Sequence, residues 1–129
     1  MDNILVPLSP GELLDKITIL EIKSERMTGA DKLAHVRAEL ALLRAAWDRS
    51  VQDDETLCAL RAQLRQVNQE LWEIEDAIRA RERAGEFDAD FIELARSVYF
   101  TNDRRAQIKQ ELNRLLGSGI VEEKSYQPY

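Results

Sequence analysis

Apolar residues recur every three or four positions through four separate stretches of this chain, the pattern of amphipathic helices that bury one face. The spacing predicts helices at residues 10–27, 31–51, 54–84 and 88–116. The third is the most regular, because its apolar positions keep heptad spacing: Leu57, Leu60, Leu64, Val67, Leu71, Ile74 and Ile78. We therefore expect Leu71 to be a core residue. The first helix has a second apolar side at Ile19 and Ile22, so we expect it to be covered on two faces.

Residues typical of helix ends stand at these boundaries. Ser9 and Pro10 match an N-cap followed by the first helical position, and Glu12 completes a capping box. Gly85 predicts the end of the third helix and Asp88 the N-cap of the fourth. The connections are short, so we expect consecutive helices to lie antiparallel, up-down-up-down. The sequence thus predicts one all-α domain, residues 1–129, built as a four-helix bundle with a short C-terminal tail.

The composition supports a folded helical chain and excludes some partners. Hydrophobic residues make up 44% and charged residues 33%, with only 5 Gly and 3 Pro. The net charge is −6 and the basic residues are interleaved with acidic ones, which disfavours nucleic acid as a partner. The start has no basic segment and no stretch approaches a membrane span. With a single cysteine, Cys58, we expect a soluble cytoplasmic protein without disulfides and without a membrane association.

No pattern assigns a metal, a cofactor or a catalytic residue. The chain has one histidine, His35, and lacks the glycine-rich phosphate loops. Acidic pairs such as Glu12 with Asp15 have a spacing that suits Mg²⁺, but 24 acidic residues produce such pairs by chance. We expect no metal site and no cofactor.

The apolar stripe of the fourth helix is interrupted by Arg105. A charge that faces a core needs a partner, because its desolvation costs several kcal/mol. A hairpin turning near residues 85–87 sets Arg105 and Asn102 against the third helix, where Glu75 with Asn68 offers a partner set. The candidate ligand-binding residues are Asn68, Trp72, Glu75, Arg79, Tyr99, Asn102 and Arg105. Such a cluster either fixes helix register or binds a ligand, and the sequence leaves both open.

Four segments together resemble a bacterial family of small proteins known only as a domain of unknown function. They are Gly11–Lys23, Asn68–Arg79, Phe91–Ala106 and Val121–Tyr126. The resemblance covers nearly the whole chain and implies no activity. Weaker likenesses to all-α chorismate mutases, in residues 14–17, and to all-α nucleotide pyrophosphohydrolases, in the acidic pairs, are analogies of fold alone.

Two functions from different classes fit these observations. The first is a helical binding or assembly module that forms a homodimer and buries Ile19 and Ile22 across a two-fold axis. The alternative is an enzyme or sensor, with or without Mg²⁺, that binds an anionic small molecule such as a nucleotide or a dicarboxylate near Arg105. The sequence does not decide whether the protein is an enzyme.

Overall fold

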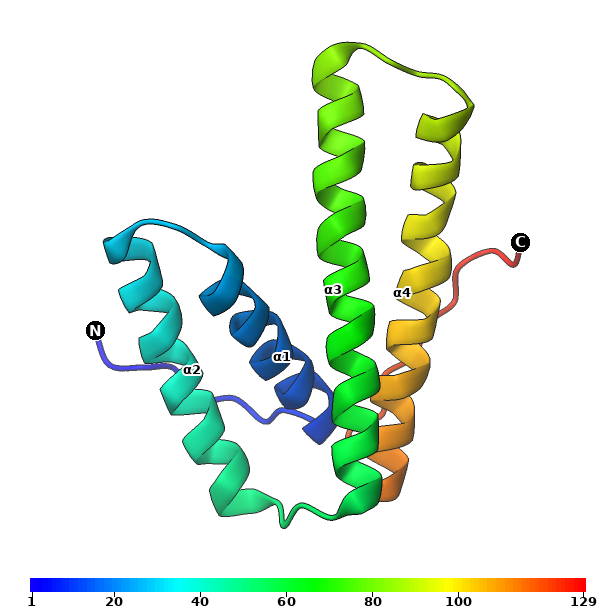
Figure 1. Cartoon of the computed structure of the whole chain (residues 1–129). Helices are drawn as coiled ribbons and strands as arrows, with labels where there is room; N and C mark the ends of the chain where they lie inside the picture. Colours follow the sequence, from blue (N-terminus) through cyan, green and yellow to red (C-terminus); the bar gives the residue numbers. More distant parts are fainter.

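The computed structural model describes all residues, 1–129, and contains four helices and no strand. The helices are α1 (Pro10–Arg26), α2 (Ala30–Ser50), α3 (Glu55–Ala84) and α4 (Ala89–Leu115), and they pack as a helical bundle (Figure 1). All four predicted helices are confirmed, with every end within one residue of its predicted position. No helix is both long enough and apolar enough to cross a membrane.

The predicted helix ends are formed by the side chains that the sequence indicated. Ser9 Oγ accepts a hydrogen bond from the backbone N–H of Glu12 at 3.2 Å, with Pro10 at the first helical position. Asp88 caps α4 in the same way, through the N–H of Phe91. Gly85 ends α3 with φ at 68°, a left-handed conformation that glycine adopts without strain.

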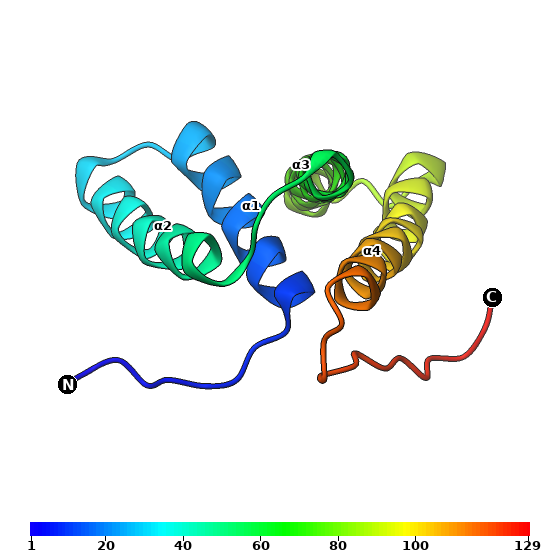
Figure 2. The same cartoon turned by 90° about the horizontal axis from the view of Figure 1, so that it is seen from below.

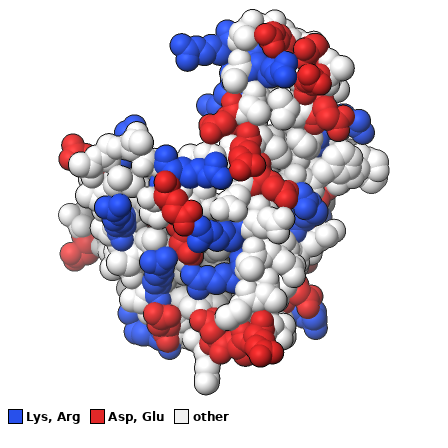
Figure 3. All heavy atoms as spheres, in the orientation of Figure 1, with Lys and Arg blue, Asp and Glu red and all other residues white.

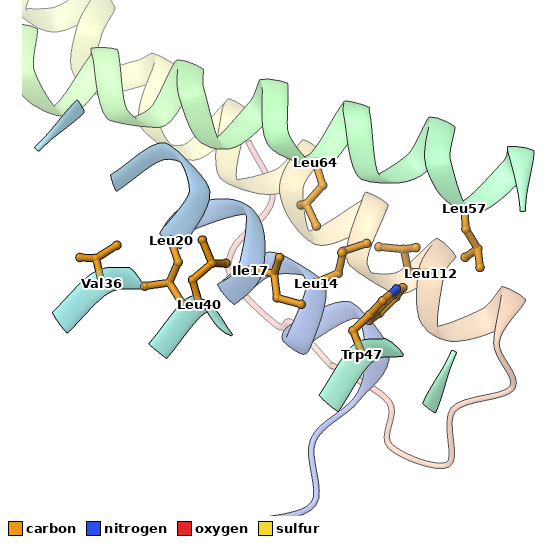
Figure 4. Packing of buried hydrophobic residues seen from close by; sticks show 9 residues of the cluster. All are labelled: Leu14, Ile17, Leu20, Val36, Leu40, Trp47, Leu57, Leu64 and Leu112. Atoms are coloured by element: carbon orange, nitrogen blue, oxygen red, sulfur yellow. The ribbon is translucent and has the colours of Figure 1, made fainter. Parts of the chain in front are cut away.

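Helix α1 lies at the centre of the fold and packs against each of the other three helices. Figure 2 shows α2 on one side of α1 and the α3–α4 pair on the other, so the prediction that this helix is covered on two faces is confirmed. The apolar core lies between these layers, where residues of all four helices meet (Figure 4): Leu14, Ile17, Leu20, Val36, Leu40, Trp47, Leu57, Leu64 and Leu112. Ile22 is also buried within the chain, at 1% exposure.

The distal half of the α3–α4 pair, residues 69–100, extends beyond the other two helices (Figure 1). We call this segment the arm. None of its residues is buried, and the last buried residue of α3 is Asn68. Leu71, Ile74 and Ile78 are only half-buried, so the expectation that the whole α3 seam lies in the core is wrong for this half. The reason is that α4 is the main cover of the arm portion of α3, because α1 diverges from α3 and reaches the arm only at its base, where Arg26 pairs with Glu73 at 3.1 Å.

The C-terminal tail, residues 117–129, runs back along α4 outside the helical layers. Lys124 forms an ion pair with Asp103 at 3.3 Å, and the ring of Tyr129 lies 5.3 Å from that of Tyr99. Aromatic and ionic contacts therefore hold the tail against α4.

Candidate functional site

A carboxylate that the sequence links only with Glu12, and not with Arg105, lies where α1, α3 and α4 meet. Asp15 is 1% exposed, and Arg105 of α4 donates to both of its oxygens, with Nε at 2.9 Å from Oδ1. Asn68 of α3 donates to the same Oδ1 at 2.9 Å. The partner that Arg105 requires is thus Asp15, reached by a two-pronged guanidinium contact.

Threonine and asparagine side chains complete this arrangement. The second N–H of the Asn68 amide donates to Thr18 Oγ1 at 3.0 Å, and that hydroxyl donates to the backbone carbonyl of Asp15 at 2.9 Å. Thr18 is fully buried. The Asn68 amide N–H groups and the Thr18 hydroxyl are therefore all paired at the α1–α3 contact, which avoids the desolvation cost of a buried donor.

Lys109, one turn after Arg105 on α4, brings a second cation to the same place. Its side chain is 7% exposed, and Nζ lies 2.7 Å from Glu12, 3.2 Å from Glu122 of the tail and 3.8 Å from Asp15. Burial by itself lowers the pKa of Lys109, but the hydrogen bond to Glu12 and the surrounding carboxylates outweigh burial and raise it. The hydrogen bond with Asp15 likewise raises the pKa of Arg105 against the effect of burial. Both side chains stay cationic. We call Asp15, Thr18, Asn68, Arg105 and Lys109 the buried polar network.

Close packing of α1 on α4 depends on Gly11. Its backbone N–H donates to Asn113 Oδ1 at 2.7 Å. A Cβ at this position would lie 2.5 Å from the carbonyl oxygen of Lys109, closer than real Cβ atoms come to backbone. The absence of a side chain therefore lets the first turn of α1 reach α4 and places Glu12 and Asp15 beside the two cations.

A cavity of about 460 Å³ opens beside Arg105 and Lys109, between α4 and the tail. We call it the tail cavity. Its lining carries three cationic and two acidic side chains together with two tyrosines: Val98, Tyr99, Asn102, Asp103, Arg105, Ala106, Lys109, Glu122, Lys124 and Tyr126. Arg105 uses Nε and Nη2 on Asp15, while Nη1 lies 3.5 Å from Asn102 Oδ1. Part of the guanidinium thus faces the cavity.

The structure brings some of the predicted site residues together and separates others. Asn68 and Arg105 meet at Asp15, and Asn102 lies beside Arg105. The expectation that Glu75 pairs with Arg105 is wrong, because Glu75 forms an exposed ion pair with Arg79, one turn away on the same helix, at 3.0 Å.

The remaining candidate residues line two different cavities. Tyr99 lines the tail cavity. Trp72 lines a second cavity, of about 370 Å³, with Glu75, Arg79 and Asn68. Arg105 borders both cavities and is their common residue.

The sequence did not place three residues of the buried polar network beside Arg105: Asp15, Thr18 and Lys109. Asp15 and Thr18 lie among the apolar positions of α1, three residues apart and therefore on one face. Lys109 and Asn113 follow Arg105 at intervals of four, which is one polar stripe along α4. These two stripes are the signal that could have identified the network.

A family model matches residues 4–129, which include the whole buried polar network and the tail cavity. The chain belongs to the DUF6165 family. That family is described as one of unknown function, so membership gives no activity. No curated protein and no solved structure matches the chain.

Proposed function

We propose that this DUF6165 protein is a helical assembly module that forms a homodimer through the arm. The observation that carries the proposal is that residues 69–100 contain no buried residue although they include the distal half of the apolar seam of α3. Stable domains bury the apolar stripe of a helix between layers, and the arm has only two helices to form one. A further layer from outside the chain would complete it.

The arm exposes large apolar side chains on α4 and at the hairpin turn. Phe87 and Ile92 are 58% and 57% exposed, and Phe100 is also exposed. Half-buried apolar residues lie between the two helices: Leu71, Ile74, Ile78, Phe91, Leu94 and Val98. A protein contact over the arm would bury these exposed apolar side chains.

A second copy of the chain is the occupant that we favour. Closed two-fold dimers are the commonest soluble oligomers, and a two-fold axis brings the same surface from both copies together. The arm portion of α3, residues 69–84, is about 24 Å long, enough for several turns of side-by-side packing. The surface differs from the one inferred from sequence, because Ile22 is already buried inside the chain and cannot face a partner.

Sedimentation velocity at about 10 µM tests this proposal, with an expected species of twice 14.8 kDa. Ile92→Asp places a charge on the arm and should return the protein to the monomer. Leu42→Asp on α2 is the matched control, since Leu42 is 60% exposed and Ile92 is 57% exposed. A monomeric native protein, or equal effects of the two variants, would contradict the proposal.

Salt separates arm-to-arm assembly from binding of a basic partner. The arm has nine acidic and four basic residues and so carries −5 of the net charge of −6. Two arms brought together repel each other, and salt screens that repulsion. The dimer should therefore strengthen when NaCl rises from about 0.05 M to about 0.5 M. Weakening over this range would indicate that the acidic arm binds a basic surface instead.

A second candidate function is the binding of an anionic small molecule in the tail cavity. It is favoured by one observation: Arg105 and Lys109, both held cationic, border a cavity of about 460 Å³ that Lys124 also lines. A thermal-shift screen of nucleotides and dicarboxylates, with and without Mg²⁺, tests it. Lys124→Gln should reduce the shift without unfolding the protein, because Lys124 is exposed. No shift with any compound would remove this candidate.

A further inference from the structure

A single glutamate of α1 is approached by three arginines from two other helices. Glu21 Oε1 accepts from Arg61 of α3 at 2.7 Å, and Oε2 accepts from Arg65 of the same helix at 3.2 Å. Arg44 of α2 reaches that second oxygen as an ion pair at 3.5 Å. Arg65 also donates to Glu25. We call Arg44, Arg61 and Arg65 the arginine cluster.

The cations in this cluster exceed the anions that hold them. Three guanidiniums face two carboxylates, Glu21 and Glu25, which leaves one positive charge in excess on a chain of net charge −6. Each guanidinium has five N–H donors, and the hydrogen bonds to the two glutamates use only three of the fifteen. Arg61 and Arg65 are also one turn apart on α3, where like charges repel. An additional anion would relieve that repulsion.

The cluster is open to solvent on the side away from Glu21. The Glu21 side chain is 11% exposed, whereas that of Arg44 is 51% exposed. Helices α2 and α3 do not pack directly on each other, so Glu21 is the point at which their arginines converge. Figure 3 shows Lys and Arg side chains across the middle of this face, between the α1–α2 pair and α3, with Asp and Glu side chains among them. The guanidiniums thus approach a mostly buried carboxylate from two helices, and that of Arg44 stays largely open to solvent.

We propose that the arginine cluster is a binding site for a phosphate group, either free phosphate or a phosphomonoester. A phosphate presents several oxygens to guanidiniums that approach from different helices, and arginine binds it through paired N–H donors. Glu21 meets the three guanidiniums with only two oxygens, and a phosphate offers more oxygens to the N–H donors that Glu21 leaves free. Nucleic acid does not fit, because the surrounding charge of the chain is negative. This site is separate from both the arm and the tail cavity.

Titration of ¹⁵N-labelled protein with inorganic phosphate, at constant ionic strength and below the concentration at which any dimer forms, tests the site. The Nε–H signals of Arg44, Arg61 and Arg65 should shift together and saturate. Arg44→Gln should weaken binding about tenfold, the loss expected for one charge-assisted contact. Arg44 is the residue to replace because its ion pair is the longest of the three, so the fold should not depend on it. Arg114→Gln is the control, since Arg114 pairs with Glu111 at the far end of α4.

A titration with O-phosphoserine distinguishes the two sources of phosphate. Tighter binding than that of inorganic phosphate would assign the site to a phosphomonoester, and weaker binding would assign it to free phosphate. Shifts that do not saturate, or equal weakening by Arg44→Gln and Arg114→Gln, would overturn the proposal and leave the cluster as a brace between helices. If Arg44→Gln changes the oligomeric state in solution but leaves phosphate binding unchanged, the phosphate proposal is overturned. The cluster would then contact the acidic arm of a second copy.

Discussion

The two halves of the α3–α4 pair have the same apolar pattern but differ in what covers them. In the proximal half α1 packs against both helices, and Leu64 and Leu112 are fully buried. In the distal half, the arm, the seam continues through Leu71 and Ile78, yet both are half-buried. Periodicity therefore reveals which face of a helix is apolar, but burial depends on whether a third element reaches that face.

The distribution of charged residues also differs between the arm and the rest of the chain. Outside the arm the chain has fourteen basic and fifteen acidic residues, close to balance, whereas the arm is strongly acidic. The interior ion pairs, Arg105 with Asp15 and Lys109 with Glu12, all lie outside the arm. The ion pairs of the arm, such as Arg79 with Glu75, are exposed and contribute little to stability. Ion pairs therefore contribute to the interior of the proximal half, whereas those of the arm lie on its surface.

The largest expected effect is that of Asp15→Ala. Removing this carboxylate leaves Arg105 and Lys109 beside each other without their shared anion, and loss of one partner of a buried ion pair typically costs about 3–5 kcal/mol. Glu75→Ala in the arm should cost less than about 0.5 kcal/mol, because its ion pair is exposed. Urea unfolding monitored by circular dichroism measures both. Similar losses for the two variants would remove the distinction between the halves.

Arg105→Met and Glu75→Ala test which carboxylate is the partner of Arg105. If Glu75 were that partner, Glu75→Ala would be the harmful change and Arg105→Met the tolerated one. Since the partner is Asp15, at 1% exposure, Arg105→Met leaves a buried carboxylate with only Lys109 and Asn68 near it. We therefore expect Arg105→Met to destabilise the fold and Glu75→Ala to be almost neutral.

The next effect compares two leucines on the same helix. Leu64→Ala should cost about 2–5 kcal/mol, because Leu64 is fully buried in the core. Leu71→Ala should cost clearly less in the monomer, because the Leu71 side chain is already partly exposed to solvent. If a second copy covers the arm, the cost of Leu71→Ala should rise with protein concentration while that of Leu64→Ala stays constant. Thermal unfolding over a range of concentrations shows whether it does.

Gly11→Ala probes the contact of α1 with α4, which the arm lacks. The added methyl group would meet backbone atoms of Lys109 at 2.5 Å, so α1 must shift, and overpacking of this kind costs about 1–3 kcal/mol. Helix propensity alone would make the same substitution favourable. A gain in melting temperature would therefore show that the close approach of the two helices is not required.

The features of the fold and the site that the sequence predicts are those that depend on residues close together in the chain. Helix ends depend on side chains within three residues, such as Ser9 with Glu12, so the boundaries were predictable. The need of Arg105 for a partner was also predictable, since it follows from one stripe. The identity of the partner was not, because Asp15 is ninety residues away and no local pattern specifies how α1 lies against α4. The apolar residues of the arm were predicted as core for the same reason. The heptad pattern of α3 does not specify where α1 diverges from it.

The smallest expected effect concerns the tail, which docks on α4 at the boundary of the arm. Hydrogen bonds from Tyr129 and Lys124 lower the pKa of Asp103 below its ordinary value, and the same contact raises the pKa of Tyr129. Because docking lowers the pKa of Asp103, the ionised carboxylate stabilises the docked tail fully above the ordinary pKa of an aspartate. This stabilisation is lost as the pH falls through the lowered value. Because docking raises the pKa of Tyr129, its protonated hydroxyl stabilises the docked tail, and this contribution is lost only as the pH rises through the raised value. The nuclear Overhauser contact between the rings of Tyr129 and Tyr99, which lie 5.3 Å apart, should therefore persist at neutral pH and fade at both extremes. Asp103→Asn should abolish the acid-side change while the helical content stays the same, and an acid transition that survives this substitution would show that another carboxylate holds the tail.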